Sequence, residues 1–244
     1  MTAPLDQPAV TSGGHRESAS GSAGQWPDAV LFDMDGTLFD SEKLWDVGLD
    51  ELAAHLGGEL SHAARVSMIG APLAMSMEIL HADLGRPDLD VATSGAWLEN
   101  HMRELFTTSL VWRAGAQELL TAVRAASIPT ALVTATRRNL VEVALDTLGR
   151  ENFDAVVCGD EVEHSKPHPE PYLRAARLLG VDPGRCVAVE DSVNGTASAE
   201  AAGCPVLVVP SEAPVPAGPR RVHRESLVGV GLAELAAVLS AVRA

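Results

Sequence analysis

The stretch AVLFDMDGT, residues 29–37, decides the fold of this chain. It opens with four consecutive apolar residues, Ala29 to Phe32, and then reaches two aspartates and a glycine. An apolar run without alternating polar positions is typical of a strand that is buried on both faces of a parallel sheet. Asp33 and Asp35 follow the carboxyl end of that strand, where Gly36 permits a tight turn. We therefore predict a buried strand that ends in a pair of carboxylates.

Short runs of the same kind, rich in valine and leucine, recur along the chain at Thr130–Val133, Ala155–Val157, Cys186–Val189 and Pro205–Val209. Helical patterns separate or follow them at Gln117–Ala126, Leu140–Leu148, Pro169–Leu179, Asn194–Ala202 and Leu232–Val242, and Pro210–Pro219 is predicted as a loop. This alternation predicts an α/β fold with a doubly wound, parallel, Rossmann-like sheet. Such sheets bind ligands at the carboxyl ends of their strands, where the strand order reverses.

Residues 43–111 interrupt the alternation, because they contain helical stripes and no run that resembles a strand. Apolar residues recur at helical spacing in three groups, at 45–56, 73–84 and 97–106. A helical segment of this length after the first strand suggests an inserted all-helical cap domain. The predicted organisation is a disordered tail at 1–25, a core at 26–42 and 112–244, and a helical cap at 43–111.

The composition limits the classes of partner. The chain is 46% hydrophobic, which allows a sizeable core, and its 33 acidic and 18 basic residues give a net charge of −15. A field of this sign repels nucleic acids and anionic membrane surfaces. No segment approaches the roughly 18 consecutive apolar residues of a membrane span, and residues 1–25 lack the pattern of a signal peptide. We expect no nucleic-acid or membrane partner and a cytoplasmic location.

Two further features lie next to predicted strands and helices. Thr134 directly follows a predicted strand, where its hydroxyl and the free backbone amides before the next helix can bind phosphate oxygens. Lys166 is one of only two lysines, with Lys43, and its compact charge suits a site that must neutralise phosphate and carboxylate together. His164 and His168 flank Lys166, but their spacing is loose for a metal pair, and we interpret them as surface residues.

Glu190 and Asp191 close another predicted strand, on the edge of the sheet where Asp33 and Asp35 are expected. Carboxylates that approach one another closely need a cation or a shared proton. Oxygen ligands without a nearby histidine or cysteine suit Mg²⁺ better than zinc or copper. The four acidic residues therefore predict a magnesium site.

The order and spacing of these features resemble those of the haloacid dehalogenase superfamily. The resemblance covers about residues 28–210 and rests on DMDGT, Thr134, Lys166-Pro167 and the Glu190-Asp191 pair. The segments DMDGTLFDSEKLW and AVEDSVNGTASAEAAG are similar to the branch of phosphatases and β-phosphoglucomutase-like proteins. The helical segment at 43–111 resembles the cap of that branch.

The resemblance implies a Mg²⁺-dependent phosphatase that acts on a small phosphorylated metabolite such as a sugar phosphate. It implies that Asp33 is the nucleophile, which forms an aspartyl-phosphate, and that Asp35 is the general acid and base. It also implies that Mg²⁺ is bound by Asp33, the backbone carbonyl of Asp35, Asp191 and Glu190, the last directly or through water.

The same resemblance implies a set of phosphate-binding groups. Thr134 and the backbone amide of Ala135 would bind the phosphoryl oxygens. Lys166 would hold both Asp33 and the phosphoryl group. The substrate itself is not indicated by any charged pattern in the cap.

A phosphomutase of the β-phosphoglucomutase type is the nearest alternative. Such a mutase carries a histidine in its first cap helix and an arginine in the cap loop. Here Trp45 fills the first position, and the loop Ile69–Leu73 contains no arginine. A mutase must hold a second phosphate on the cap, which normally takes a cation, so these residues favour hydrolysis. The helical spacing of Trp45 slightly favours core packing over substrate contact.

Three other classes of protein share part of this pattern. A dehalogenase of the founding type needs neither Asp35 nor the acidic pair, and both are present. A phospho-accepting signalling domain is about half this length and lacks a helical lid. A non-catalytic module that binds a phosphorylated metabolite would share the fold, and metal-dependent turnover separates it from an enzyme.

Overall fold

The computed structural model describes residues 26–68, 71–211 and 213–242, so the predicted tail at 1–25 lies outside the described residues. The strands are β1 (Ala29–Phe32), β2 (Thr130–Val133), β3 (Ala155–Val157), β4 (Cys186–Glu190), β5 (Val206–Val208) and β6 (Arg221–His223). The helices are α1 (Glu42–His55), α2 (His62–Met68), α3 (Leu73–Asp83), α4 (Val91–Ser109), α5 (Ala116–Ala125), α6 (Arg138–Leu148), α7 (Glu170–Leu179), α8 (Val193–Ala201) and α9 (Leu232–Ala241). Short 3₁₀ turns lie at Arg150–Asn152, Gly159–Glu161 and Pro183–Arg185.

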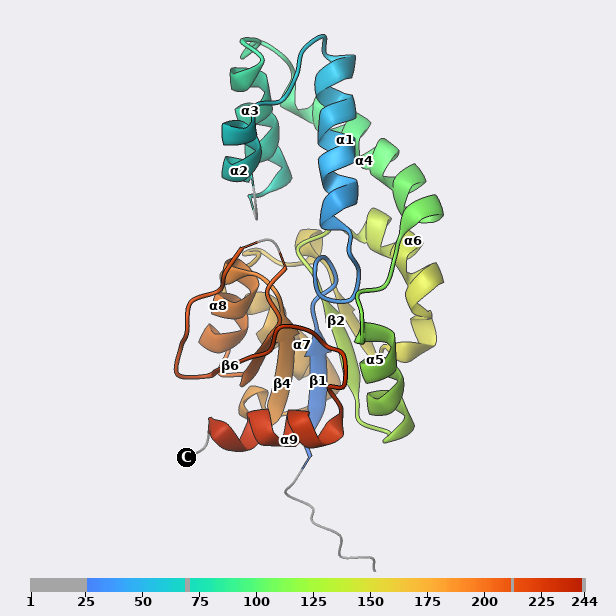
Figure 1. The fold of residues 1–244 in the computed structure, drawn as a ribbon, viewed down its shortest axis with the longest axis vertical. Coiled ribbons are helices and arrows are strands. Elements are labelled where there is room, and N and C mark those ends of the chain that lie inside the picture. The colour runs from blue at the N-terminus through green and yellow to red at the C-terminus, as the bar shows by residue number, and fades with distance from the viewer. Residues whose placement is uncertain (1–25, 69–70, 212, 243–244) are drawn as a thin grey trace, which may run out of the picture.

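The strands of the described residues form one parallel sheet in the order β3-β2-β1-β4-β5-β6 (Figure 1). Leu31 of β1 is paired with Ala131 of β2 on one side and with Ala188 of β4 on the other. The chain moves outward from β1 to β3 and then returns to the other side of β1. The strand order therefore reverses between β1 and β4, which is where sheets of this kind bind ligands. The predicted α/β fold class is confirmed.

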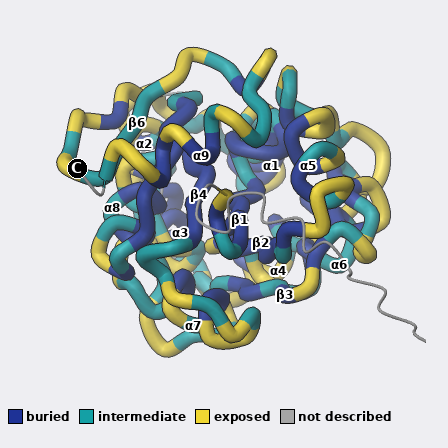
Figure 2. Tube along the Cα trace, turned by 90° about the horizontal axis from the view of Figure 1, so that it is seen from below, coloured by how far each residue is buried: buried dark blue, intermediate teal, exposed yellow. Residues whose placement is uncertain are grey.

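Alternate side chains of β1 pack on opposite faces of the sheet. Val30 and Phe32 belong to an apolar cluster that includes α5, α6 and α9, whereas Ala29 and Leu31 pack with α7 and the end of α8. All four residues are fully buried. Figure 2 shows the buried strands at the centre of this part of the molecule, with exposed segments around them. Burial on both faces is the physical reason that continuous apolar runs identify these strands.

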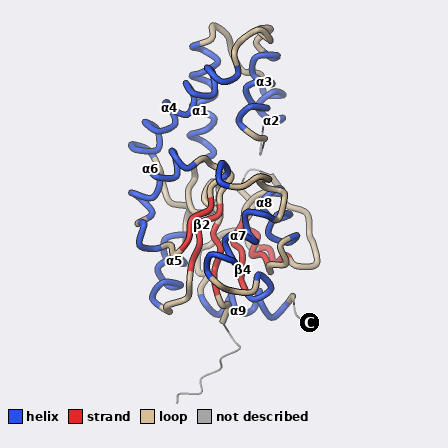
Figure 3. The backbone as a smooth tube through the Cα atoms, turned by 180° about the vertical axis from the view of Figure 1, so that it is seen from behind, coloured by secondary structure: helices blue, strands red, loops and turns tan. Residues whose placement is uncertain are grey.

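Helices α1 to α4, which we call the helical insert, lie beyond the carboxyl end of β1 (Figures 1 and 3). Their interface buries Leu52 of α1, Met77 of α3, and Leu98 and Met102 of α4. The three predicted helical stripes correspond to α1, α3 and α4. No helix among the described residues is both long enough and apolar enough to cross a membrane.

One strand and one α-helix of the described residues were not predicted. The edge strand β6 has three residues, all partly exposed, and contains Arg221 and His223, so it offers no apolar run. Helix α2 buries only Ala64 and Met68, which is too few for a recognisable stripe. Both elements are held mainly by their neighbours in the fold.

Candidate active site

The carboxyl ends of β1 and β4 bring three acidic side chains together. Asp33 follows β1, and its backbone N–H donates to the carbonyl of Val189 at 3.0 Å. Glu190 ends β4, and Asp191 comes next. One carboxylate oxygen from each of the three residues lies within 4.8 Å of the others, and all three residues are buried. The acidic cluster thus sits at the point where the strand order reverses.

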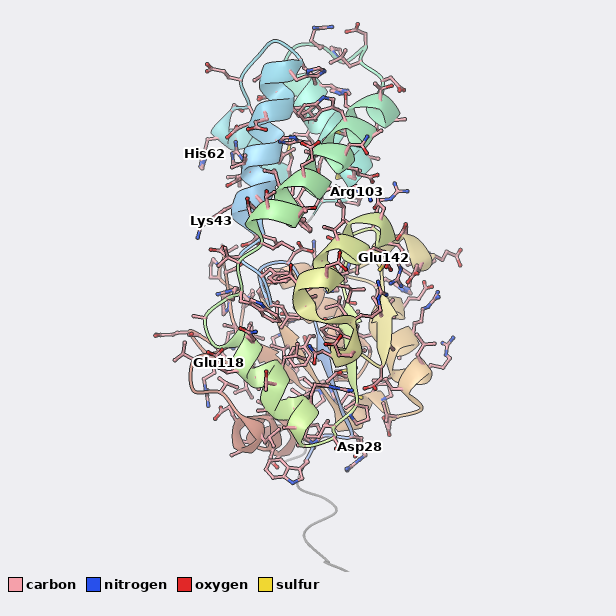
Figure 4. The ribbon with its side chains drawn as sticks, turned by 90° about the vertical axis from the view of Figure 1, so that its right-hand side faces the viewer. Asp28, Lys43, His62, Arg103, Glu118 and Glu142 are labelled. Carbon is pink, nitrogen blue, oxygen red and sulfur yellow. The ribbon has the colours of Figure 1, made fainter. Side chains whose placement is uncertain are left out.

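Lys166 provides the positive charge within this cluster. Its Nζ donates to Asp33 Oδ1 at 2.6 Å, to Glu190 Oε1 at 2.7 Å and to the carbonyl of Val133 at 2.8 Å. Burial lowers the pKa of Lys166, but Asp33 and Glu190 outweigh that effect and raise it above its usual value. The ammonium therefore stays charged. The side chain of Lys166 is 6% exposed, whereas that of Lys43 is 77% exposed and points outward (Figure 4).

The acidic cluster carries more negative charge than Lys166 neutralises. One ammonium faces three carboxylates, so two negative charges remain when all three are ionised. Burial raises the pKa of Asp33 despite the opposing charge of Lys166, and burial together with Glu190 raises the pKa of Asp191 to about 7. Asp33 Oδ2 is buried without a hydrogen-bond partner among the described residues. A divalent metal ion bound through oxygen atoms fits both features.

The carboxylate of Asp35 lies among hydrogen-bond donors from two parts of the chain. Its Oδ1 accepts from Ser41 Oγ at 2.7 Å and from Trp45 Nε1 at 3.4 Å. Its Oδ2 accepts from Thr136 Oγ1 at 2.7 Å and from Thr134 Oγ1 at 3.2 Å. Ser41 directly precedes α1 and Trp45 lies in the first turn of α1, whereas the second pair of donors follows β2. Asp35 therefore joins the insert to the sheet.

The loop after β2 is held in a tight conformation. Thr134 is buried, its N–H donates to the carbonyl of Val157 at 3.0 Å, and its Oγ1 accepts from the N–H of Thr136 at 3.0 Å. The next residue, Ala135, is exposed. Its carbonyl lies against Gly159, where a Cβ atom would be 2.0 Å from that oxygen. Close backbone packing thus fixes the position of Ala135 at the edge of the site.

Sequence reasoning missed Tyr172, the only tyrosine of the chain. Its hydroxyl donates to Glu190 Oε1 at 2.6 Å, and its ring centroid lies 5.2 Å from Lys166 Nζ. Burial and the charge of Glu190 raise the pKa of Tyr172 well above its usual value, so it remains a protonated donor. The sequence offered one indication of this role, because the single tyrosine lies in the first turn of α7, shortly after Lys166.

Asp191 has partners that sequence reasoning also missed. Its Oδ1 accepts from Thr37 Oγ1 at 3.3 Å, and its Oδ2 accepts from Ser211 Oγ at 2.6 Å. Ser211 Oγ also lies 2.5 Å from Glu42 Oε2, and its single proton serves one carboxylate at a time. Gly36 has φ of 76°, and a Cβ there would lie 2.2 Å from Asp191 Oδ2. Asp191 is therefore enclosed by the loop after β1 and by the segment after β5.

Gly195 in the first turn of α8 leaves space for Glu190. A Cβ at this position would lie 2.0 Å from both carboxylate oxygens. We expect Gly195→Ala to displace Glu190 and to lower the free energy of unfolding by about 1–3 kcal/mol, as overpacking does. Urea unfolding measures this change.

The matched control is Gly95→Ala in α4. Its Cβ would have its nearest neighbour, a Leu73 atom, at an ordinary 3.5 Å. We expect this variant to raise the free energy of unfolding by up to about 1 kcal/mol, because alanine favours helix over glycine. Equal effects of the two substitutions would contradict the packing described for Glu190.

Comparisons with protein-family models and with known proteins point to the same family. The model of haloacid dehalogenase-like hydrolases matches residues 27–203. Hexitol phosphatase B of Escherichia coli (strain K12) is 32% identical over 188 residues, which are 75% of this chain and 83% of that protein. Fructose-1-phosphate phosphatase YqaB of the same strain is 32% identical over 177 residues, which are 71% of this chain and 92% of that protein.

A solved structure agrees with these relatives. CbbY from Rhodobacter sphaeroides, in complex with phosphate, superposes with a TM-score of 0.76 at 29% identity, over 86% of this chain and 99% of that chain. The family model covers well over half of the chain. The resemblance seen in the sequence motifs is confirmed, and the chain belongs to the haloacid dehalogenase-like hydrolases.

Proposed function

We propose that this chain is a Mg²⁺-dependent phosphatase that hydrolyses a sugar phosphate through an aspartyl-phosphate on Asp33. The observation that carries this proposal is the position of Lys166 between Asp33 and Glu190, with Asp191 in the same buried cluster. The names of two relatives, hexitol phosphatase and fructose-1-phosphate phosphatase, support a phosphorylated sugar as the substrate class.

We assign Mg²⁺ to the carboxylates of Asp33, Glu190 and Asp191 and to the backbone carbonyl of Asp35. The side-chain ligands are oxygen atoms only, as Mg²⁺ prefers, and the unpartnered Asp33 Oδ2 lies among buried acidic groups. When bound, Mg²⁺ would neutralise charge on the phosphoryl group and on the carboxylates around it.

Asp33 is the proposed nucleophile. Lys166 holds Oδ1 at 2.6 Å, which restricts the rotation of the carboxylate. An oxygen of Asp33 forms a bond to phosphorus while the bond from phosphorus to the sugar oxygen breaks. Thr134 Oγ1, the N–H of Ala135 and the ammonium of Lys166 are proposed to bind the phosphoryl oxygens, since fixed donors stabilise the charge of the transition state.

Asp35 is the proposed acid and base. It gives a proton to the sugar oxygen as that oxygen leaves, and it then takes a proton from the water that attacks phosphorus. The second step releases phosphate and restores the carboxylate of Asp33. The donors Ser41 and Thr136, each 2.7 Å from Asp35, orient its carboxylate before the substrate enters.

The helical insert is proposed to act as a cap, with the core at 26–42 and 112–244 and the cap at 43–111. Ser41 and Trp45 connect its first helix to Asp35, so movement of α1 would reach the acid and base directly. Trp45 also packs edge-on against Phe106 with ring centroids 6.2 Å apart. Closure of such a lid would exclude bulk water from the site.

Phosphate release from p-nitrophenyl phosphate and from a panel of phosphorylated sugars tests this function. We expect release with Mg²⁺ and none after its removal with EDTA. Conversion of a sugar phosphate into its isomer without phosphate release would favour the mutase. Absence of metal-dependent release from every compound would favour a binding module.

A further inference from the structure

Two histidines and a glutamate gather on the surface beside the loop that carries Lys166. The rings of His164 and His168 have centroids 4.6 Å apart, and Nδ1 of His164 lies 3.3 Å from Oε2 of Glu170. One ligand atom from each of the three residues lies within 4.8 Å of the others. Both histidines are exposed, as predicted, but the turn into α7 places them next to each other.

We propose that His164, His168 and Glu170 form a second metal site, which takes Zn²⁺ or a similar imidazole-preferring divalent ion. Imidazole nitrogen suits Zn²⁺, Cu²⁺ and Ni²⁺, whereas Mg²⁺ prefers oxygen. Bonds of about 2.0–2.1 Å in a tetrahedral site place ligand atoms about 3.3 Å apart. His164 and Glu170 already have this separation, so only the exposed side chain of His168 has to move closer.

The backbone around the three residues is fixed by hydrogen bonds. Glu170 accepts from the N–H of Glu163 at 3.0 Å and from the N–H of His164 at 2.9 Å. The N–H of His168 donates to the carbonyl of Ser165 at 3.0 Å. The same backbone donors lower the pKa of Glu170, so its carboxylate is ionised at neutral pH. Each carboxylate oxygen has two lone pairs, which leaves capacity for a metal ion.

Two existing contacts compete with metal binding. Nδ1 of His164 lies within hydrogen-bond range of Glu170 Oε2, so an ion bound to both atoms would displace any proton held between them. Nδ1 of His168 accepts from the N–H of Glu170 at 3.3 Å, beyond the usual range for such a bond. Coordination through Nε2 would transfer the ring proton to Nδ1 and end this weak contact. The net charge of the chain, −15, favours the approach of a cation in general.

The site is separate from the buried acidic cluster in its chemistry and its exposure. It offers two nitrogens and one oxygen at the surface, whereas Asp33, Glu190 and Asp191 offer buried oxygens. Lys166 lies between the two histidines in the sequence. An ion bound there would therefore brace the loop that presents Lys166 to Asp33.

Calorimetric titration of the untagged full-length protein with Zn²⁺, in excess Mg²⁺, tests the proposal. We expect the wild type to bind one more equivalent of Zn²⁺ than the double variant His164→Gln, His168→Gln. The double variant should bind that equivalent of Zn²⁺ with an affinity at least ~100-fold lower, since loss of a residue that only supports a metal ligand already lowers metal affinity ~10–100-fold. Zn²⁺ should also raise the melting temperature of the wild type more than that of the double variant.

His62→Gln is the matched control, because His62 is an exposed histidine on the helical insert (Figure 4). It should bind Zn²⁺ as the wild type does. The single variant His168→Gln keeps the His164–Glu170 contact and should show a smaller loss than the double variant. Unchanged Mg²⁺-dependent phosphate release in the double variant is expected, because neither histidine belongs to the catalytic machinery. Equal Zn²⁺ binding by the wild type and the double variant would overturn the proposal.

Discussion

Asp33→Asn is expected to abolish turnover and to leave the protein folded. An amide has the size of the carboxylate but cannot form an aspartyl-phosphate, so we expect a loss on the order of 10⁶ in kcat, as for other removed nucleophiles. Burial raises the pKa of Asp33, and Glu190 and Asp191 add to this effect. The ionised carboxylate of Asp33 therefore destabilises the folded protein when no metal ion is bound. Without Mg²⁺, the thermal unfolding midpoint of Asp33→Asn should therefore equal or exceed that of the wild type.

Asp40→Asn is the matched control for this prediction. Asp40 lies in the same loop and pairs with the exposed Lys43, so its substitution should leave kcat unchanged. Steady-state phosphate release and thermal unfolding of the purified variants give both quantities. Clear steady-state activity of Asp33→Asn would show that another group is the nucleophile.

Lys166→Met is expected to lower both turnover and stability. Methionine nearly matches the length of lysine but leaves Asp33 and Glu190 buried without their cation, and breaking a buried pair costs about 3–5 kcal/mol. The phosphoryl group also loses a donor that we assign to it. Urea unfolding and phosphate release measure the two losses.

The loss of stability in Lys166→Met should depend on pH. Burial raises the pKa of Asp33 and Lys166 opposes it, so removal of the ammonium raises that pKa further. Asp33 takes up a proton on folding in both proteins, but in the variant stability continues to fall to higher pH, up to the further raised pKa. The difference from the wild type should thus be larger at pH 8 than at pH 5.

The other lysine supplies the control. The side chain of Lys43 is 77% exposed, and Lys43→Met should change the free energy of unfolding by no more than about 0.5 kcal/mol. If Lys166→Met and Lys43→Met gave equal stability and activity, the role described for Lys166 would be wrong.

The sheet was predictable because its strands are buried on both faces, which leaves continuous apolar runs in the sequence. β1, β2 and β3 begin and end where the runs do, and β4 continues for one more residue, Glu190. That residue pairs with Val208 of β5, a contact that apolar patterning cannot reveal. β6 was missed for the opposite reason, since its polar residues lie at the edge of the sheet.

The meeting of Asp33, Glu190, Asp191 and Lys166 follows from parallel topology, because the carboxyl ends of parallel strands lie on one edge. The roles assigned to them stay predictions until the variants are measured. Tyr172 could not be identified in advance, because its hydroxyl reaches Glu190 only through the packing of α7 on the sheet.

The roles of Ser211 and Thr136 could not be predicted for the same reason. Each is a small polar residue in a loop, and its importance depends on which carboxylate the fold brings near it. The proximity of His164 and His168 was also not predicted. Their spacing in the sequence does not show that the turn places their ring centroids 4.6 Å apart.

Covalent trapping of the intermediate tests the central claim most directly. The enzyme is mixed with Mg²⁺ and an active sugar phosphate, quenched in acid during turnover, and reduced with borohydride, which converts an aspartyl-phosphate into homoserine. We expect peptide mapping to find homoserine at position 33 and nowhere else, and only when substrate and Mg²⁺ are both present. Turnover without any modification at Asp33, or with modification at another carboxylate, would contradict the account.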